Sequence, residues 1–317
     1  MRMIPALFVL LFLFQPASWS GDSARGQRLK IGLCMANLDA FLGSVADAAV
    51  QRAAEKGLDL VLLDAQDDDA NQLQQVHILL DERVDALVLN PTSTASSGRV
   101  VDAAAQLGVP VVWVNKNPFA GRSIPQGNYV IVSDNIREGE LGMECAGGAL
   151  GGKGGIVLLR GTPGHEAAEG RTAGAMRVLR ERFPELRVLA EEHGNWSRER
   201  GAEIMRRFVS THGDAIRGVV SNNDEMALGA VHVLRAAGMD GVVVCSVDGT
   251  RDGIASVESG KGITATAYQD PYAQGSGAID LAVKAAAGEE ANSLTTIPAE
   301  MVTRENVREF KRRLQRR

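Results

Sequence analysis

Short apolar runs of strand length alternate with stretches of helical periodicity along most of this chain. Strands are predicted at residues 30–36, 58–64, 84–90, 109–115, 129–133, 155–160, 186–191, 216–221, 241–247 and 262–268. Helices are predicted at residues 41–56, 70–82, 95–107, 135–150, 167–182, 197–212, 224–237, 250–259, 272–287 and 303–315. Such regular alternation predicts an α/β fold with parallel sheets covered by helices on both faces. Because ten strands approach the upper limit of a single open sheet, the sequence favours two sheets.

Several predicted strands end in asparagine or aspartate where the chain turns into a helix. The most informative segment, residues 218–230, reads GVVSNNDEMALGA. Similar elbows end at Asn90, Asn115, Asp134 and Asp248. Because open α/β folds bind ligands at the carboxyl edge of their strands, these side chains predict a cleft lined with hydrogen-bonding groups. Uncharged and acidic groups of this kind favour a neutral, polyhydroxylated ligand.

The glycine-dense segment GGALGGKGG, at residues 147–155, partly matches a phosphate-binding loop. However, Gly154 occupies the position of the required Ser or Thr, and a predicted strand follows where the motif requires a helix. We therefore interpret the segment as a connection from a helix to a strand, and we reject a nucleotide site.

The first 20 residues predict a secretory signal peptide. A positively charged start precedes an apolar stretch at residues 4–14, and the small residues Ser18 and Ser20 precede the expected cleavage. About eleven apolar residues are too few to span a bilayer, which takes roughly 20. The sequence therefore favours export over a membrane anchor.

Charge and cysteine content exclude further classes of protein. The net charge of −5 argues against nucleic acid as a partner, because nucleic-acid-binding surfaces are basic. The basic tail at residues 311–317 is interpreted as the solvated end of a terminal helix. Cys34, Cys145 and Cys245 are too few and too scattered for a disulfide framework, and a single disulfide bond is the alternative that stays open.

Five segments carry a family resemblance, at residues 30–41 (KIGLCMANLDAF), 109–118 (VPVVWVNKNP), 158–171 (LLRGTPGHEAAEGR), 218–230 and 246–250 (SVDGT). They resemble the periplasmic sugar-binding proteins of ABC transporters, in the ribose, galactose/glucose and inositol group. The resemblance implies a type I periplasmic binding protein, with two flavodoxin-like lobes joined by a three-crossing hinge. The implied lobes are residues 28–133 plus 270–296 and residues 134–269 plus 297–310.

The same resemblance implies a function in transport. A periplasmic monomer would capture one monosaccharide or cyclitol between its lobes and deliver it to an ABC permease in the membrane. The alternative that the sequence leaves open is a ligand-sensing subunit for a chemoreceptor or sensor kinase, because these differ in the partner rather than in the cleft.

By the resemblance, the first lobe contributes Asp39, Phe41 and Asn115 to the ligand site. An aromatic ring can pack on the C–H face of a sugar while polar groups bind its hydroxyls. Asp39 could instead cap the following helix, and Phe41 could belong to the core. Lys116 could reach the ligand or be a solvated surface lysine.

The second lobe and the hinge would contribute His165, Arg171, Trp196, Asn223, Asp248 and Gln269. Arginine can donate to two neighbouring oxygens, which suits vicinal hydroxyls. The alternative for Arg171 is an exposed ion pair with Glu166 or Glu169. Asp224 and Glu225 are interpreted as residues that open a helix.

The chain departs from the galactose/glucose pattern at two positions. Ala36 stands where a Tyr is expected, and Ala167 stands where an Asp is expected. The calcium loop of that subgroup is also missing, because residues 147–155 offer almost no oxygen ligands. We therefore predict no metal and no cofactor, with myo-inositol or a hexose as ligand; galactose, glucose and ribose stay open.

Two other classes of protein are disfavoured. A sugar-acting enzyme could use Asp39, His165 and Asp248 as acid and base, but aromatic residues make up only 4% of the chain, which is little for an oligosaccharide groove. No GxSxG or HExxH motif is present. A transcriptional repressor would need a DNA-binding helix pair where the signal peptide is predicted. The sequence therefore predicts no catalytic residues.

Overall fold

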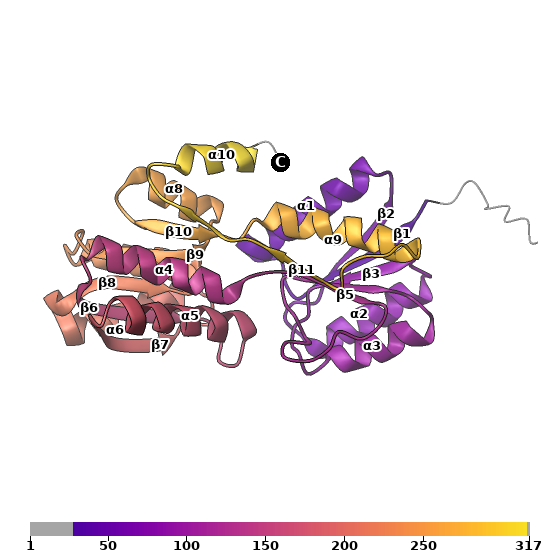
Figure 1. The fold of residues 1–317 in the computed structure, drawn as a ribbon, viewed down its shortest axis with the longest axis horizontal. Coiled ribbons are helices and arrows are strands. Elements are labelled where there is room, and N and C mark those ends of the chain that lie inside the picture. Colours follow the sequence, from indigo (N-terminus) through magenta and orange to yellow (C-terminus); the bar gives the residue numbers. More distant parts are fainter. Residues whose placement is uncertain (1–27, 316–317) are drawn as a thin grey trace, which may run out of the picture.

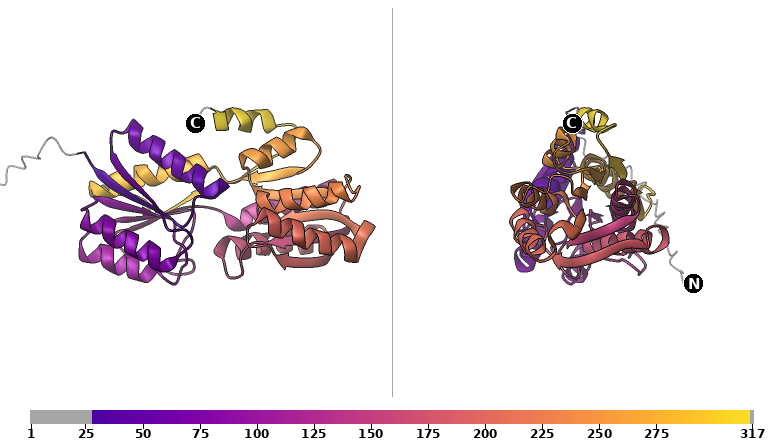
Figure 2. Two further views of the ribbon diagram at one scale, coloured as in Figure 1. Left: turned by 180° about the vertical axis from the view of Figure 1, so that it is seen from behind. Right: turned by 90° about the vertical axis from the view of Figure 1, so that its left-hand side faces the viewer.

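The computed structural model describes residues 28–315, which form two α/β halves side by side along the long axis of the molecule (Figures 1 and 2). The first half contains a six-stranded parallel sheet with the strand order β11-β5-β4-β3-β1-β2. Its strands are β1 (Lys30–Met35), β2 (Asp59–Asp64), β3 (Ala86–Leu89), β4 (Val111–Val114), β5 (Asn128–Ser133) and β11 (Leu294–Ile297).

Helices cover both faces of this first sheet. Alternate residues of a strand point to opposite faces, so Val88 packs with one set of helices and Leu87 with the other. One face is covered by α1 (Ala40–Glu55) and α9 (Pro271–Ala286), and the other by α2 (Asp69–Asp81) and α3 (Ser97–Gln106). Burial on both faces explains why these strands read as continuous apolar runs.

The second half repeats this plan with the strand order β12-β10-β9-β8-β6-β7. Its strands are β6 (Lys153–Arg160), β7 (Glu185–His193), β8 (Ile216–Ser221), β9 (Val243–Asp248), β10 (Ala265–Tyr268) and β12 (Glu300–Val302). Its helices are α4 (Asn135–Ala149), α5 (Glu166–Arg182), α6 (Arg198–His212), the short 3-10 turn η1 (Gly213–Ala215), α7 (Asp224–Ala236), α8 (Arg251–Ser259) and α10 (Val307–Gln315).

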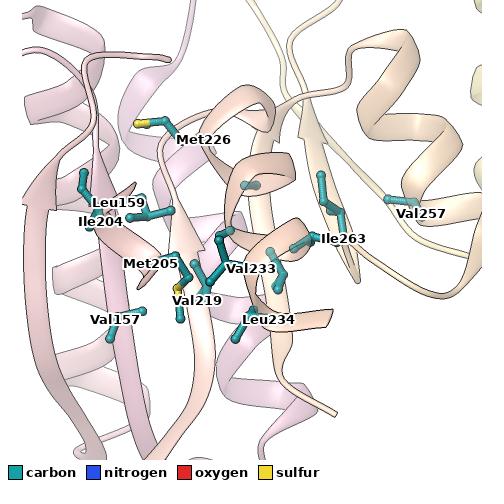
Figure 3. Packing of buried hydrophobic residues seen from close by; sticks show 14 of the residues in the cluster. Val157, Leu159, Ile204, Met205, Val219, Met226, Val233, Leu234, Val257 and Ile263 are labelled. Atoms are coloured by element: carbon teal, nitrogen blue, oxygen red, sulfur yellow. The ribbon is translucent and has the colours of Figure 1, made fainter. Parts of the chain in front are cut away.

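The core of the second half lies on the two faces of its sheet. Figure 3 shows the cluster on one face, where Met205 of α6, Val233 of α7 and Ile263 meet strand residues such as Val219. On the other face, α4 and α5 cover a second cluster that includes Met143.

The predicted α/β fold with two sheets is confirmed, and every predicted strand and helix is present within a few residues. Two strands, β11 and β12, and the short turn η1 were not predicted. Both strands are short and partly exposed, so neither has the apolar run that marks the other strands. In addition, β12 pairs antiparallel with β10, so the expectation of purely parallel sheets is wrong at this edge.

The chain passes between the two sheets three times. The crossings follow β5, follow β10, and connect β11 with β12. The residue bounds of the two lobes stay a prediction. The predicted signal peptide at residues 1–20 lies outside the described residues, as do the last two residues of the predicted basic tail.

All three cysteines are free thiols, and those of Cys145 and Cys245 lie within hydrogen-bonding reach of each other. Between residues 28 and 315, the helices are too short or too polar to cross a membrane.

Candidate ligand-binding cleft

One cavity of about 400 Å³ lies between the two halves and brings all nine predicted site residues together. They approach it from the carboxyl ends of strands and from the loops and helix starts that follow. These residues are Asp39, Phe41, Asn115, His165, Arg171, Trp196, Asn223, Asp248 and Gln269. Their shared position is a finding, and their contact with a ligand stays a prediction.

The loop after β1 supplies Asp39 and Phe41. Asp39 caps α1, because its Oδ1 accepts hydrogen bonds from the backbone N–H groups of Phe41 (2.9 Å) and Leu42 (2.8 Å). Phe41 packs partly against the core of the first half. Both residues also line the cavity, so each combines a structural contact with a place in the candidate site.

A buried hydrogen-bond chain joins the two halves at the crossing after β10. The Gln269 amide donates from Nε2 to Oδ1 of Asp248 (2.6 Å), and its Oε1 accepts from the Ser133 hydroxyl (3.1 Å). Asn115, which has a left-handed φ of 66°, donates to Oε1 of Gln274 (3.1 Å). These bonds fix the amide groups of Asn115 and Gln274 in the first half and link Gln269, in the crossing, to both halves.

Lys116 also lines the cavity, although it was not among the predicted site residues. Its Nζ donates to the carbonyl oxygens of Pro91 (2.6 Å) and Thr92 (3.1 Å). It is only 7% exposed, so the interpretation as a solvated surface lysine is wrong. Burial lowers the pKa of its ammonium group to about 8.

Arg171 of α5 is buried and its guanidinium is fixed by partners in the second half. Nε donates to Oε2 of Glu138 (2.8 Å), and Nη1 donates to the carbonyl oxygen of Asn222 (2.6 Å). Nη1 also lies 3.5 Å from Oδ1 of Asp248. The alternative of an exposed ion pair with Glu166 or Glu169 is therefore wrong.

Glu138, in the first turn of α4, does not line the cavity but binds the guanidinium of Arg171, a role that the sequence did not reveal. It is fully buried, and its Oε1 has no hydrogen-bond partner among the described residues. Burial raises the pKa values of both Glu138 and Asp248, and the Arg171 guanidinium offsets part of this effect. Two buried carboxyl groups therefore share one arginine, and of these three residues Arg171 and Asp248 line the cavity.

Trp196 and His165 form an aromatic corner of the cavity. Trp196 has a left-handed φ of 66°, and its ring lies so close to Gly161 that a Cβ there would overlap it. The two rings meet edge to face, with centroids 5.1 Å apart. The Arg171 guanidinium lies 5.7 Å from the centre of the Trp196 ring.

His165 caps α5, because its Nδ1 accepts a hydrogen bond from the backbone N–H of Ala167 (3.2 Å). Burial, together with the charges of Lys116 and Arg171, lowers the His165 pKa to about 3. The ring is therefore neutral at physiological pH, and its Nδ1 is an acceptor.

We expect His165→Asn to make unfolding less sensitive to acid. Because the folded-state pKa lies below the unfolded value, the unfolded chain binds the extra proton, and wild-type stability falls as the pH drops from about 6.5 towards about 3. Asparagine keeps the cap without the titration. Urea titrations at pH 7 and pH 5 should show a loss up to about 2 kcal/mol larger in the wild type. Equal losses in both proteins would contradict the assigned pKa.

Asn223 and its neighbours position the start of α7. Asn223 caps this helix by accepting from the N–H of Met226 (3.0 Å), and its Nδ2 donates to the carbonyl oxygen of Trp196 (3.1 Å). Asp224 does open the helix, but it is also fully buried and accepts from the hydroxyl of Thr266. Glu225 pairs with Arg198 at 2.8 Å.

The cavity has a mixed charge pattern without a metal cluster. Its lining contains two basic residues, Lys116 and Arg171, and three acidic residues, Asp39, Asp67 and Asp248. In the part of the chain that the structure describes, no three His, Cys, Asp or Glu side chains are grouped so as to hold a metal ion.

Comparison with known proteins gives one consistent result. Residues 31–290 match the family model described as a periplasmic binding protein domain. A putative rhizopine-binding protein of Rhizobium meliloti is 33% identical over 285 residues, covering 88% of this chain and 92% of that protein. The ribose import binding protein of Escherichia coli (strain K12) is 30% identical over 265 residues, covering 84% and 87%.

Solved structures share the whole fold. An ABC transporter solute-binding protein from Bacillus halodurans C-125 with bound myo-inositol superposes with a TM-score of 0.85. It is 35% identical, and the match covers 92% of this chain and 99% of that chain. A periplasmic solute-binding protein from Actinobacillus succinogenes 130z with bound D-allose has a TM-score of 0.83 and 26% identity, with coverage of 89% and 100%.

Proposed function

The chain belongs to the periplasmic binding protein family of ABC transporters, and from this premise we propose that it captures a neutral monosaccharide or cyclitol and delivers it to a membrane permease. The observation that carries this proposal is the cavity between the halves. It combines amide, carboxylate and guanidinium groups from both sides with the rings of Phe41 and Trp196. Such a lining suits a compact ring that carries hydroxyl groups on its rim.

We propose myo-inositol or a hexose as the ligand. The bound molecules named for two solved relatives are myo-inositol and D-allose, both six-carbon polyols. Ala36 and Ala167 line the cavity in place of polar residues, so two polar contacts of the galactose/glucose pattern are missing. This difference favours a cyclitol over galactose or glucose.

The mechanism we propose is a shift of population between open and closed forms. A ligand bound by Asn115 on one side and by Arg171 and Asp248 on the other favours the closed form, because only there do both sets of partners reach it. Binding then needs no chemical step, and the ligand is recovered unchanged. We propose that this happens in the periplasm.

A thermal-shift panel tests the proposal. We expect myo-inositol or a hexose to raise the melting temperature of the purified protein, since a ligand that binds only the folded state stabilises it. The panel contains myo-inositol, galactose, glucose, ribose and xylose, with buffer as blank. If every compound leaves the melting temperature at the value of the blank, the proposed ligand class is wrong.

A further inference from the structure

One hydrogen bond joins the two halves at the cleft but away from the three crossings. The backbone N–H of Asn117, in the loop after β4, donates to Oε2 of Glu166 over 3.0 Å. Glu166 is the first residue of α5, in the second half. Other side-chain hydrogen bonds between the halves lie at the crossing after β10, where Gln269 accepts from Asn115 and Ser133 and the Tyr268 hydroxyl donates to Oδ1 of Asp270 (3.4 Å). The Asn117–Glu166 bond, which we call the latch, is thus separate from the hinge.

Both partners of the latch are held in place by their own half. The Asn117 side chain accepts from the N–H of Phe119 (2.9 Å), which fixes the loop that presents the Asn117 amide. Glu166 lies at the N-terminus of α5, where the helix dipole favours a carboxylate. Burial raises the pKa of Glu166, and the hydrogen bond from the Asn117 N–H and the positive charge of Lys116 offset part of this rise. The latch therefore joins two preorganised groups.

The latch also lies beside the cavity. The residues immediately before its two partners, Lys116 and His165, both line the cavity from opposite halves. When the latch forms, these two cavity-lining residues are held across from each other. A separation of the halves would break the latch and open the cavity at the same place.

We propose that the latch between the Asn117 amide and the Glu166 carboxylate stabilises the closed cleft and slows release of the ligand. This inference rests on the proposed function, because it needs a cleft that closes on a ligand. A contact made in the closed form alone shifts the equilibrium towards that form, whether or not a ligand is present. A hydrogen bond of ordinary net strength changes such an equilibrium about five- to tenfold.

Release kinetics test the latch. Trp196 lines the cavity while Trp113 is buried in the core, so stopped-flow tryptophan fluorescence reports on the cleft. With the panel compound that binds the wild type, Glu166→Ala should release ligand about five- to tenfold faster, with association changed less than about twofold. Glu166→Gln keeps an acceptor oxygen, so it should speed up ligand release by a smaller factor than Glu166→Ala.

The matched control is Glu169→Ala. Glu169 is an exposed residue three positions further along α5, and its carboxylate pairs with Arg160. Wild-type release from Glu166→Ala would overturn the inference.

A second measurement needs no ligand. Small-angle X-ray scattering of the ligand-free proteins should give a larger radius of gyration for Glu166→Ala than for the wild type and for Glu169→Ala. Equal radii would overturn the latch. If the radius increases but no panel compound binds the wild type, the latch stands and the proposed ligand class fails, so the two failures are distinguishable.

Discussion

Replacing Arg171 with alanine is expected to abolish ligand binding and to lower the free energy of unfolding by about 3–5 kcal/mol. The substitution leaves the carboxyl groups of Glu138 and Asp248 buried without the guanidinium that lies 2.8 Å and 3.5 Å from them. Urea unfolding and thermal-shift titration of the variant measure both effects.

The pH dependence of this variant follows from the same pair of carboxyl groups. Burial already raises the pKa values of Glu138 and Asp248, and loss of Arg171 removes the charge that opposes this rise. With folded-state pKa values above the unfolded ones, these two groups stabilise the folded state as the pH falls, and more so in the variant than in the wild type. His165 opposes this effect in both proteins, so the variant should lose less stability than the wild type between pH 7 and pH 5. A variant that loses stability between pH 7 and pH 5 as the wild type does would contradict this account.

Two further variants separate binding from folding. Arg207→Ala removes an exposed ion pair with Glu192. It should lower the free energy of unfolding by less than about 1 kcal/mol and leave ligand affinity at the wild-type value.

Asp248→Asn keeps the shape of the side chain, and Asn tolerates the left-handed φ of 127° at this position. We expect this variant to fold and to lose on the order of 10- to 100-fold in affinity, because an amide NH2 replaces one of the two carboxyl oxygens that can bind the ligand. Wild-type affinity of Asp248→Asn would remove Asp248 from the site.

Replacing Gly139 with alanine should destabilise the protein by about 3 kcal/mol. A Cβ on Gly139 would overlap the carbonyl oxygen of Arg171 and lie 2.7 Å from its Cα. Because both contacts are with backbone, α4 and α5 would have to move apart. That movement would also displace Arg171 from Glu138, so affinity should fall with stability. Urea unfolding and ligand titration of the variant test both consequences.

Gly148 provides the matched control on the same helix. It is exposed near the end of α4, and an added Cβ would meet no atom within 4 Å. Alanine has the higher helix propensity, so Gly148→Ala should raise the free energy of unfolding by about 0.5 kcal/mol. If Gly139→Ala and Gly148→Ala change stability alike, close packing of α4 on α5 does not explain the need for Gly139.

Much of the fold and many of the site residues could be predicted because their signals are local. A buried parallel strand is a short apolar run, and a polar residue directly after it lies at the ligand-binding edge of a sheet. This reasoning marks Asn115, Asp248 and the segment that contains Asn223, the family resemblance selects these three as site residues, and the structure places them in one cavity. The short strands β11 and β12 lack such a run, so they could not be found in this way.

Other residues of the cleft could not be predicted because their roles depend on distant partners. Glu138 reads as an ordinary helix residue, yet it is buried against Arg171, 33 positions away. The sequence left Lys116 as either a ligand contact or a surface lysine, and only the fold brings the carbonyl oxygens of Pro91 and Thr92 to its Nζ. Glu166 meets the Asn117 amide only because two halves of the chain face each other. Such pairings depend on tertiary structure, and the periodicity of a single sequence predicts only local structure.

Isothermal titration calorimetry of the wild type with myo-inositol, D-allose, glucose, galactose and ribose tests the central claim most directly. We expect one of these polyols to bind with a stoichiometry of one per chain, and Asp248→Asn to weaken that same compound on the order of 10- to 100-fold. The control is that the protein unfolds cooperatively. If such a protein gives no binding heat with any of the five compounds at several temperatures, the proposal that the cleft binds a neutral ring polyol is contradicted.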